Sequence, residues 1–262
     1  MFPTGHGRYG KGTQYHAFNL ASNTWQLHYL RLTNQLTDDT MHLMREVFKQ
    51  MNLEFTAVMR RYNSRGAMSM WDRSKPSVWL TAWVLRIFDD VSFQDWEDFI
   101  YIDPAIFGAS TMWLLNYQKA DGEFVETEDH EIPVHQAMSP RDNAWHSNMT
   151  RHVPLTAHVL LTLIKISPKL TGKTKKYAST GRHRAMRYLE RALARISNPY
   201  DLAITAYALA LSRSSEADTA YGRLLTIRRS ESGLVYWSPT PTLTTGCAIS
   251  STAPSWRPRT DS

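Results

Sequence analysis

Cysteine is almost absent from this sequence, since Cys247 is the single cysteine among 262 residues. One cysteine excludes a disulfide framework and a cysteine-based zinc site, and it offers no partners for a cysteine nucleophile. The shortage alone is typical of a reducing compartment, but a chain of this length buries a large core and needs no disulfide bonds. Cysteine usage therefore limits the chemistry without deciding where the protein works.

Long apolar runs are also missing. No stretch of about 18 apolar residues occurs, so the sequence predicts no membrane-spanning helix. Residues 1–5 lack the basic and apolar regions of a signal peptide. The chain is therefore either cytosolic or a piece of a longer secreted protein.

The positive charge is not gathered into one obvious motif. The formal net charge is +6 and the sequence pI is about 9.4, with short basic runs at 173–176, 182–187 and 228–229. A nucleic-acid-binding protein is expected to show a basic stripe with interleaved aromatic residues. We interpret the scattered runs as solvated helix faces and expect no nucleic-acid partner.

Helical periodicity dominates the rest of the chain. Apolar residues in 44–58 and 185–196 recur at i, i+3, i+4 and i+7, which predicts amphipathic helices. The segments 78–88, 155–166 and 202–211 are apolar on nearly all sides, so they are expected to be buried. The full set of expected helices is 20–33, 39–60, 77–89, 104–118, 154–166, 178–196, 200–212 and 216–228.

The three apolar segments share a pattern. Leu-Thr-Ala-Trp-Val-Leu at 80–85 is echoed by Leu-Thr-Ala-His-Val-Leu at 155–160 and by Ile-Thr-Ala-Tyr-Ala-Leu at 204–209. An internal repeat of buried helices alternating with amphipathic helices indicates stacked helical hairpins, with the buried helices as the inner layer.

The composition changes after Trp237. Fifteen of the twenty-five residues in 238–262 are Ser, Thr or Pro, and no periodicity remains there. The sequence therefore predicts one domain over 1–237 and a disordered tail over 238–262.

Several segments together resemble a known family. They are Pro-Thr-Gly-His-Gly at 3–7, the helix around 29–36, Pro-Ser-Val-Trp-Leu-Thr-Ala at 76–82, Gln-Lys-Ala-Asp-Gly-Glu-Phe-Val-Glu at 118–126 and Pro-Val-His-Gln-Ala-Met at 133–138. In order and spacing they resemble the thioester domain of complement components and α-macroglobulins. The resemblance covers roughly residues 3–237.

That resemblance implies a fold and an incomplete copy of it. The family's thioester domain is an all-α, α/α toroid of six helical hairpins, like the terpenoid cyclases and protein prenyltransferases. Eight helices supply four hairpins, so the chain resembles a truncated toroid with open edges. We expect apolar side chains to be exposed at these edges, namely Trp25, Leu27, Leu209, Tyr221, Leu224 and Leu225.

The residues that make the family's thioester are replaced here. The bond forms between a cysteine thiol and a glutamine three residues later, and these positions correspond to His6 and Tyr9. Imidazole and phenol cannot form it. His135 corresponds to the histidine that attacks the thioester in nucleophilic catalysis, and the acidic residue two positions later is Ala137. We therefore expect no catalytic residue, no cofactor and no enzymatic activity.

Other candidate sites are weaker. His6, His16 and His28 do not have zinc-ligand spacing, and no metal site is expected. The acidic residues of the loop after residue 125 are interpreted as solvated; they are Glu126, Glu128, Asp129 and Glu131. Asn148 begins an Asn-Met-Thr sequence that predicts N-glycosylation if the protein is secreted.

A thioester-type domain without its thioester resembles the insect macroglobulin complement-related proteins. This implies an extracellular, non-catalytic domain of a larger macroglobulin chain, with protein or cell-surface partners in innate immune recognition or septate-junction adhesion. Two alternatives stay open. One is a fragment of an α-macroglobulin-type protease inhibitor, and the other is a toroid enzyme of the terpene cyclase or prenyltransferase class, whose Asp-rich motif or zinc site is not found here.

Overall fold

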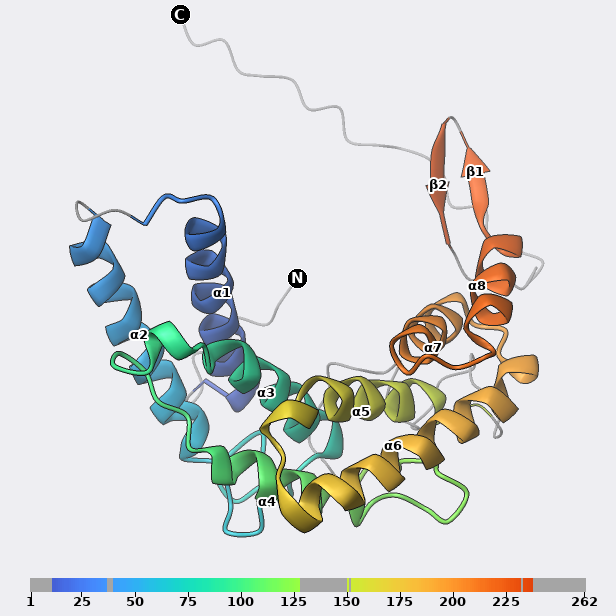
Figure 1. The fold of residues 1–262 in the computed structure, drawn as a ribbon, viewed down its shortest axis with the longest axis horizontal. Coiled ribbons are helices and arrows are strands. Elements are labelled where there is room, and N and C mark those ends of the chain that lie inside the picture. The colour runs from blue at the N-terminus through green and yellow to red at the C-terminus, as the bar shows by residue number, and fades with distance from the viewer. Residues whose placement is uncertain (1–10, 37–39, 128–149, 151, 232, 238–262) are drawn as a thin grey trace, which may run out of the picture.

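The computed structural model describes residues 11–36, 40–127, 150, 152–231 and 233–237, and this part of the chain is almost entirely helical (Figure 1). The α-helices are α1 (Thr13–Leu32), α2 (Met41–Met59), α3 (Val78–Val91), α4 (Pro104–Leu115), α5 (Val153–Lys165), α6 (Gly172–Ala192), α7 (Pro199–Leu211) and α8 (Ala217–Thr226). Each corresponds to one of the eight helices expected from the sequence. None of these helices is long and apolar enough to cross a membrane.

Consecutive helices pack as hairpins in two layers. α1 packs on α2, α3 on α4, α5 on α6 and α7 on α8. The odd-numbered helices also pack side by side in the order α1, α3, α5, α7, while α4 packs on α6 in the outer layer. The α1–α2 and α7–α8 hairpins lie at opposite ends of an open arc (Figure 1). This is the stacked α/α arrangement predicted from the repeat.

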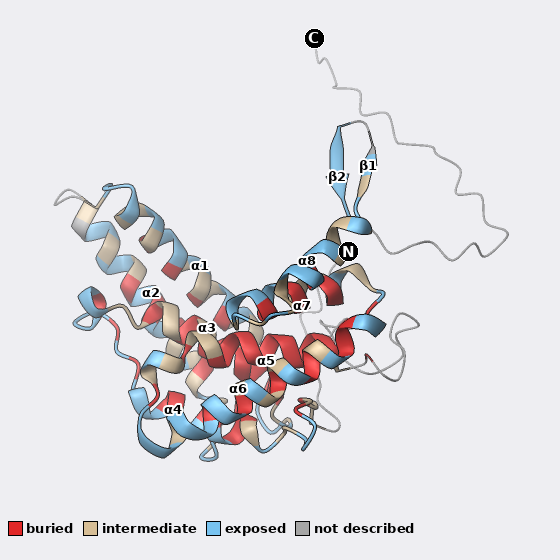
Figure 2. Cartoon of the chain, turned by 45° about the vertical axis from the view of Figure 1, so that its right-hand side comes forward, coloured by how far each residue is buried: buried red, intermediate tan, exposed pale blue. Residues whose placement is uncertain are grey.

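The core follows the inner layer. Every residue of α5 from Val153 to Leu163 is buried, and ten of the fourteen residues of α3 are buried (Figure 2). Each fully buried Leu or Phe contributes about 1.5–3 kcal/mol relative to an exposed one. α7 is buried on one side only, because Tyr207 is 58% and Leu211 is 46% exposed. The expectation of all-round burial thus holds for α3 and α5 but only in part for α7.

The shared Leu-Thr-Ala pattern has a structural reason. The hydroxyl of Thr81 in α3 accepts a hydrogen bond from the backbone N–H of Met68, at 2.9 Å. The hydroxyl of Thr156 in α5 accepts one from the N–H of Phe124, also at 2.9 Å. In both cases the turn that follows an outer helix is attached to the next inner helix. Thr205 occupies the same place in α7, but no described residue bonds to its buried hydroxyl.

The exposed edges differ in detail from the expectation. Trp25 and Tyr221 are 55% and 57% exposed, as expected, but Leu27 and Leu209 are 1% and 0% exposed. The two leucines lie on the faces of α1 and α7 that pack into the core, so the expectation that they are exposed was wrong. The exposed apolar side chains of α1 instead follow a stripe of Tyr15, Phe18, Trp25, Tyr29 and Leu32.

Two further features were not expected from the sequence. α1 begins at Thr13, seven residues before the expected start, because tertiary contacts hold its first turn. After α8 the chain forms a short antiparallel hairpin of β1 (Arg229–Glu231) and β2 (Leu234–Tyr236), with Gly233 at φ +81° in the turn. This hairpin projects away from the helices (Figure 1).

Candidate functional site

The predicted site residues His6, Tyr9, His135 and Asn148 all lie outside the described residues. The structure does describe the chain next to them, from Lys11 onward and up to Thr127. These flanking residues show where two segments leave the described fold. The first segment contains His6 and Tyr9, and the second contains His135.

The first segment enters the fold beside the residues that lead into α3. The backbone N–H of Thr13 donates to the carbonyl of Met70 at 3.0 Å, and its hydroxyl donates to the carbonyl of Ser69 at 2.6 Å. Gly12 lies against Trp71 so closely that an added Cβ would be 3.0 Å from the indole ring. The start of α1 is therefore fixed to the segment 69–71.

The second segment leaves from the same neighbourhood. The carboxylate of Glu126 accepts hydrogen bonds from the backbone N–H groups of Val78 and Trp79 at 2.6 and 2.9 Å, and from the hydroxyl of Ser77 at 2.9 Å. Its charge also complements the positive end of the α3 dipole. The hydroxyl of Thr127 donates to the carbonyl of Pro76 at 2.6 Å.

Glu126 thus corrects one expectation. From the sequence it is expected to belong to a solvated acidic loop, but its carboxylate caps α3 and the residue is half-buried. The other three acidic residues of that loop lie outside the described residues. A single antiparallel bridge between Ser69 and Pro76 joins the contact points of the two segments. The chain to His6 and the chain to His135 therefore leave the described fold at neighbouring points.

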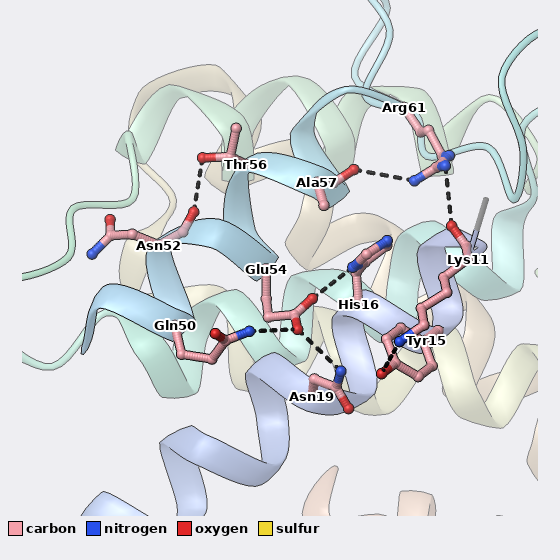
Figure 3. Close-up of polar contacts among 10 residues, drawn as sticks. All are labelled: Lys11, Tyr15, His16, Asn19, Gln50, Asn52, Glu54, Thr56, Ala57 and Arg61. Carbon is pink, nitrogen blue, oxygen red and sulfur yellow. Dashed lines mark hydrogen bonds and ion pairs between the residues drawn. The ribbon is translucent and has the colours of Figure 1, made fainter. Parts of the chain in front are cut away.

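A polar cluster beside the first segment joins α1 to α2 (Figure 3). Nδ1 of His16 donates to the buried carboxylate of Glu54 at 2.6 Å, and the side-chain amides of Asn19 and Gln50 each donate to it at 3.0 Å. Burial alone raises the pKa of Glu54, but the three hydrogen bonds outweigh burial and hold its pKa below the ordinary value. The cluster is a charged clamp between two helices.

The nearby tyrosine completes this end of α1. Nζ of Lys11 donates to the hydroxyl of Tyr15 at 2.5 Å, and this hydrogen bond lowers the pKa of the phenol. The guanidinium of Arg61 donates to the backbone carbonyl of Lys11 at 3.1 Å (Figure 3). No described hydroxyl or thiol is bonded to His16, so the His16–Glu54 pair has no nucleophile to activate.

The turn at 118–126 has a structural role. The side-chain amide of Gln118 donates to the carbonyls of Gly122 and Gly181 at 3.1 and 2.8 Å, and Arg184 donates to its oxygen at 2.6 Å. Phe124 is fully buried. The turn therefore joins α4 to α6, while Glu126 at its end caps α3.

The comparison with known families now decides the identity. A family model of the A-macroglobulin TED domain matches residues 8–255. The chain belongs to this family.

Curated relatives of the TED domain are proteins of the thioester, complement and macroglobulin groups. Thioester-containing protein 1 allele S1 of Anopheles gambiae is 28% identical over 228 residues, covering 83% of this chain and 15% of that protein. Complement C3 of Oncorhynchus mykiss is 27% identical over 191 residues, covering 70% and 10%. Ovostatin homolog 1 of Homo sapiens is 31% identical over 118 residues, covering 44% and 9%. The chain thus spans a small part of the length of each relative.

The histidines of the TED domain's first helix have separate partners. His16 binds Glu54, whereas Nε2 of His28 donates to the carbonyl of Asp90 at 3.0 Å. Twelve helical residues separate the two imidazoles by about 18 Å along the axis, so they do not share a metal. Within the described ranges, no group of three His, Cys, Asp or Glu side chains is arranged to hold a metal ion.

Sequence reasoning missed the two carboxylates that organise this end of the TED domain. Glu54 is separated from His16 by 38 residues, and Glu126 from Val78 by 48 residues. The only local signal is that His16 and Asn19 share one face of a helix, as do Gln50 and Glu54. Partners this far apart in sequence become visible only in the fold.

Proposed function

We propose that this TED domain has lost its thioester and acts as a non-catalytic binding and scaffolding domain of an extracellular thioester-containing protein. Innate immune recognition or septate-junction adhesion is the role we assign to that protein. The observation that carries the proposal is the replacement of the thioester pair by His6 and Tyr9. The likeness to a mosquito thioester-containing protein and to a complement C3 supports the immune setting.

The positions of the flanking residues support the proposal that His6 and His135 still lie near each other, although these residues cannot form a thioester. His6 lies seven residues before Thr13, and His135 lies eight residues after Thr127. The contacts of Thr13 and Thr127 bring the two flanks to the bridged Ser69–Pro76 pair. We infer that His6 and His135 lie on the same face of the domain, because both connections start at this one pair.

A distance between spin labels tests this inference. The variant carries His6→Cys and His135→Cys, with Cys247→Ser to remove the native thiol. A domain of this size is at least about 45 Å wide, and we expect a label separation of less than half that width. A separation that spans the domain contradicts the assignment of both positions.

The protease-inhibitor alternative rests on the resemblance to α-macroglobulins, and the match to the A-macroglobulin TED domain is consistent with it. It requires domains outside this chain, and it predicts that the full-length protein forms a stable complex with an added protease. The enzyme alternative drew support from a likeness of the segment 118–124 to the Gln-Trp repeats of toroid enzymes, and here this segment forms a turn that joins α4 to α6. We therefore propose the binding role over both.

A further inference from the structure

The excess positive charge of this chain is concentrated on one helix. α6 contains seven of the 30 Lys and Arg residues and only one of the 24 acidic residues, Glu190. Its formal excess of six positive charges equals the net charge of the whole chain. From the sequence these runs are interpreted as scattered, and the helix is expected to begin at residue 178. In the structure the helix begins at Gly172, which brings the runs 173–176 and 182–187 onto the same element.

The cations of α6 form a stripe along its outward face. Lys173, Lys176, Arg187 and Arg191 lie on one face of the helix at helical spacings and are all exposed. The opposite face is buried against α4 and α5 (Figure 2). From the first to the last of these residues the stripe is about 27 Å long. It lies on the outside of the arc, where no other described helix covers it (Figure 1).

Few carboxylates neutralise this stripe. Arg187 forms a surface ion pair with Glu190 at 3.3 Å, and Arg191 donates to the backbone carbonyl of Asp121. Among the described residues, no carboxylate lies within ion-pair distance of Lys173 or Lys176. Like charges at i, i+3 and i, i+4 destabilise a helix by about 0.2–0.5 kcal/mol per pair. The cations of this row therefore repel one another, and binding of an anionic ligand reduces that repulsion.

The stripe continues into a hollow at its C-terminal end. This hollow has a volume of about 560 Å³ and is lined by Asp121, Tyr188, Arg191, Ala192 and Arg195. Its lining has two guanidinium groups against the single carboxylate of Asp121, and arginine binds anionic oxygens with paired N–H donors. The row of cations and the hollow are therefore continuous.

We propose that the outward face of α6 binds a linear sulfated polysaccharide. Single-stranded nucleic acids are bound on platforms of successive aromatic side chains, and Tyr177 is the only exposed aromatic residue of α6. Helices that bind lipid surfaces insert an apolar face, but the apolar face of α6 is buried in the domain. A straight, exposed row of Lys and Arg complements a linear polysaccharide whose negative sulfate groups project from its surface. The choice of an extracellular polysaccharide rests on the proposed extracellular role.

Binding of a fluorescent heparin-derived oligosaccharide to the full chain tests the proposal. The stripe variant carries Lys173→Gln, Lys176→Gln and Arg187→Gln. The matched control carries Arg45→Gln, Lys49→Gln and Arg60→Gln on or beside the outer helix α2. Both triples remove three exposed cations, and each removes one member of a surface ion pair, Arg187–Glu190 or Lys49–Glu46.

We expect the stripe variant to bind at least about tenfold more weakly, with a shallower dependence of affinity on salt, because each lost contact releases one counterion fewer. The control should change affinity by less than about twofold, since distant surface charges are screened. Lys173→Arg with Lys176→Arg should retain binding. Circular dichroism should show equal helicity in all variants, because the substituted side chains are exposed.

Three results would each overturn the proposal. They are an equal loss in both triples, no binding of the oligosaccharide at all, and tighter binding of single-stranded DNA or of anionic vesicles at the same salt concentration. The assay uses the isolated chain, so its outcome does not depend on where the protein works. Failure here leaves the thioester-loss proposal untouched, since that one is judged by amine reactivity.

Discussion

Among the glycines that the structure describes, Gly122 has the least room for a side chain. Its φ of +101° lies in a region that residues with a Cβ rarely adopt, and an added Cβ would overlap the backbone carbonyl of Arg184 in α6. The obstacle is helix backbone, which cannot rotate away as a flexible side chain does. We estimate about 1–3 kcal/mol for the backbone conformation and about 1–3 kcal/mol for the overpacking. Gly122→Ala should therefore lose about 2–6 kcal/mol of unfolding free energy.

Urea denaturation followed by circular dichroism measures this loss. With a domain stability of about 5–15 kcal/mol, the substitution should lower the urea midpoint by about 1–2 M. Gly222→Ala is the control, because Gly222 is exposed in α8 and nothing lies within 4 Å of its added Cβ. The control should gain about 0.5–1 kcal/mol from the better helix former. A Gly122→Ala midpoint equal to that of the wild type would refute the reasoning.

Three further outcomes are expected. Glu126→Ala should cost about 1–3 kcal/mol, because two N–H groups of α3 lose their acceptor, and Glu126→Gln should cost less; equal midpoints in urea would exclude the cap. The folded-state pKa of Glu54 is depressed, so its stabilisation is present at neutral pH and is lost as the pH falls through that pKa. The stability gap between wild type and Glu54→Gln should therefore narrow below about pH 4, and a constant gap down to pH 3 would contradict this. In the secreted full-length protein, Asn148→Gln should remove one glycan, seen by intact mass; an unchanged glycan mass means that the site is unused.

Much of the fold follows from local pattern. The amphipathic periodicity of α2 and of the second half of α6 lies within single segments, as do the apolar runs of α3 and α5, and the Leu-Thr-Ala repeat indicates the inner layer. The first turn of α1 could not be predicted, because Thr13 and His16 are mixed polar residues whose helical state depends on Met70 and Glu54. The β1–β2 hairpin was missed since its strands have only three residues each.

The candidate site also combines features that follow from local sequence with features that depend on tertiary contacts. The positions of His6 and His135 come from motif resemblance and stay predictions, while the cap by Glu126 depends on a contact across 48 residues. The basic stripe was not predicted. The expected start of α6 is six residues too late, and it leaves Lys173 and Lys176 outside the helix that carries the later cations. Local patterns therefore predict the elements well, and the groups that organise the site emerge from contacts between elements.

Loss of the thioester is the central claim, and a thiol titration before and after methylamine treatment tests it most directly. An intact thioester conceals a cysteine thiol until an amine opens it, whereas this chain has Cys247 as its single cysteine. We predict one free thiol per chain in both states and no methylamine adduct on the peptide that contains His6 and Tyr9. A thiol count that rises on methylamine treatment, with a matching adduct in the mass spectrum, would contradict the account.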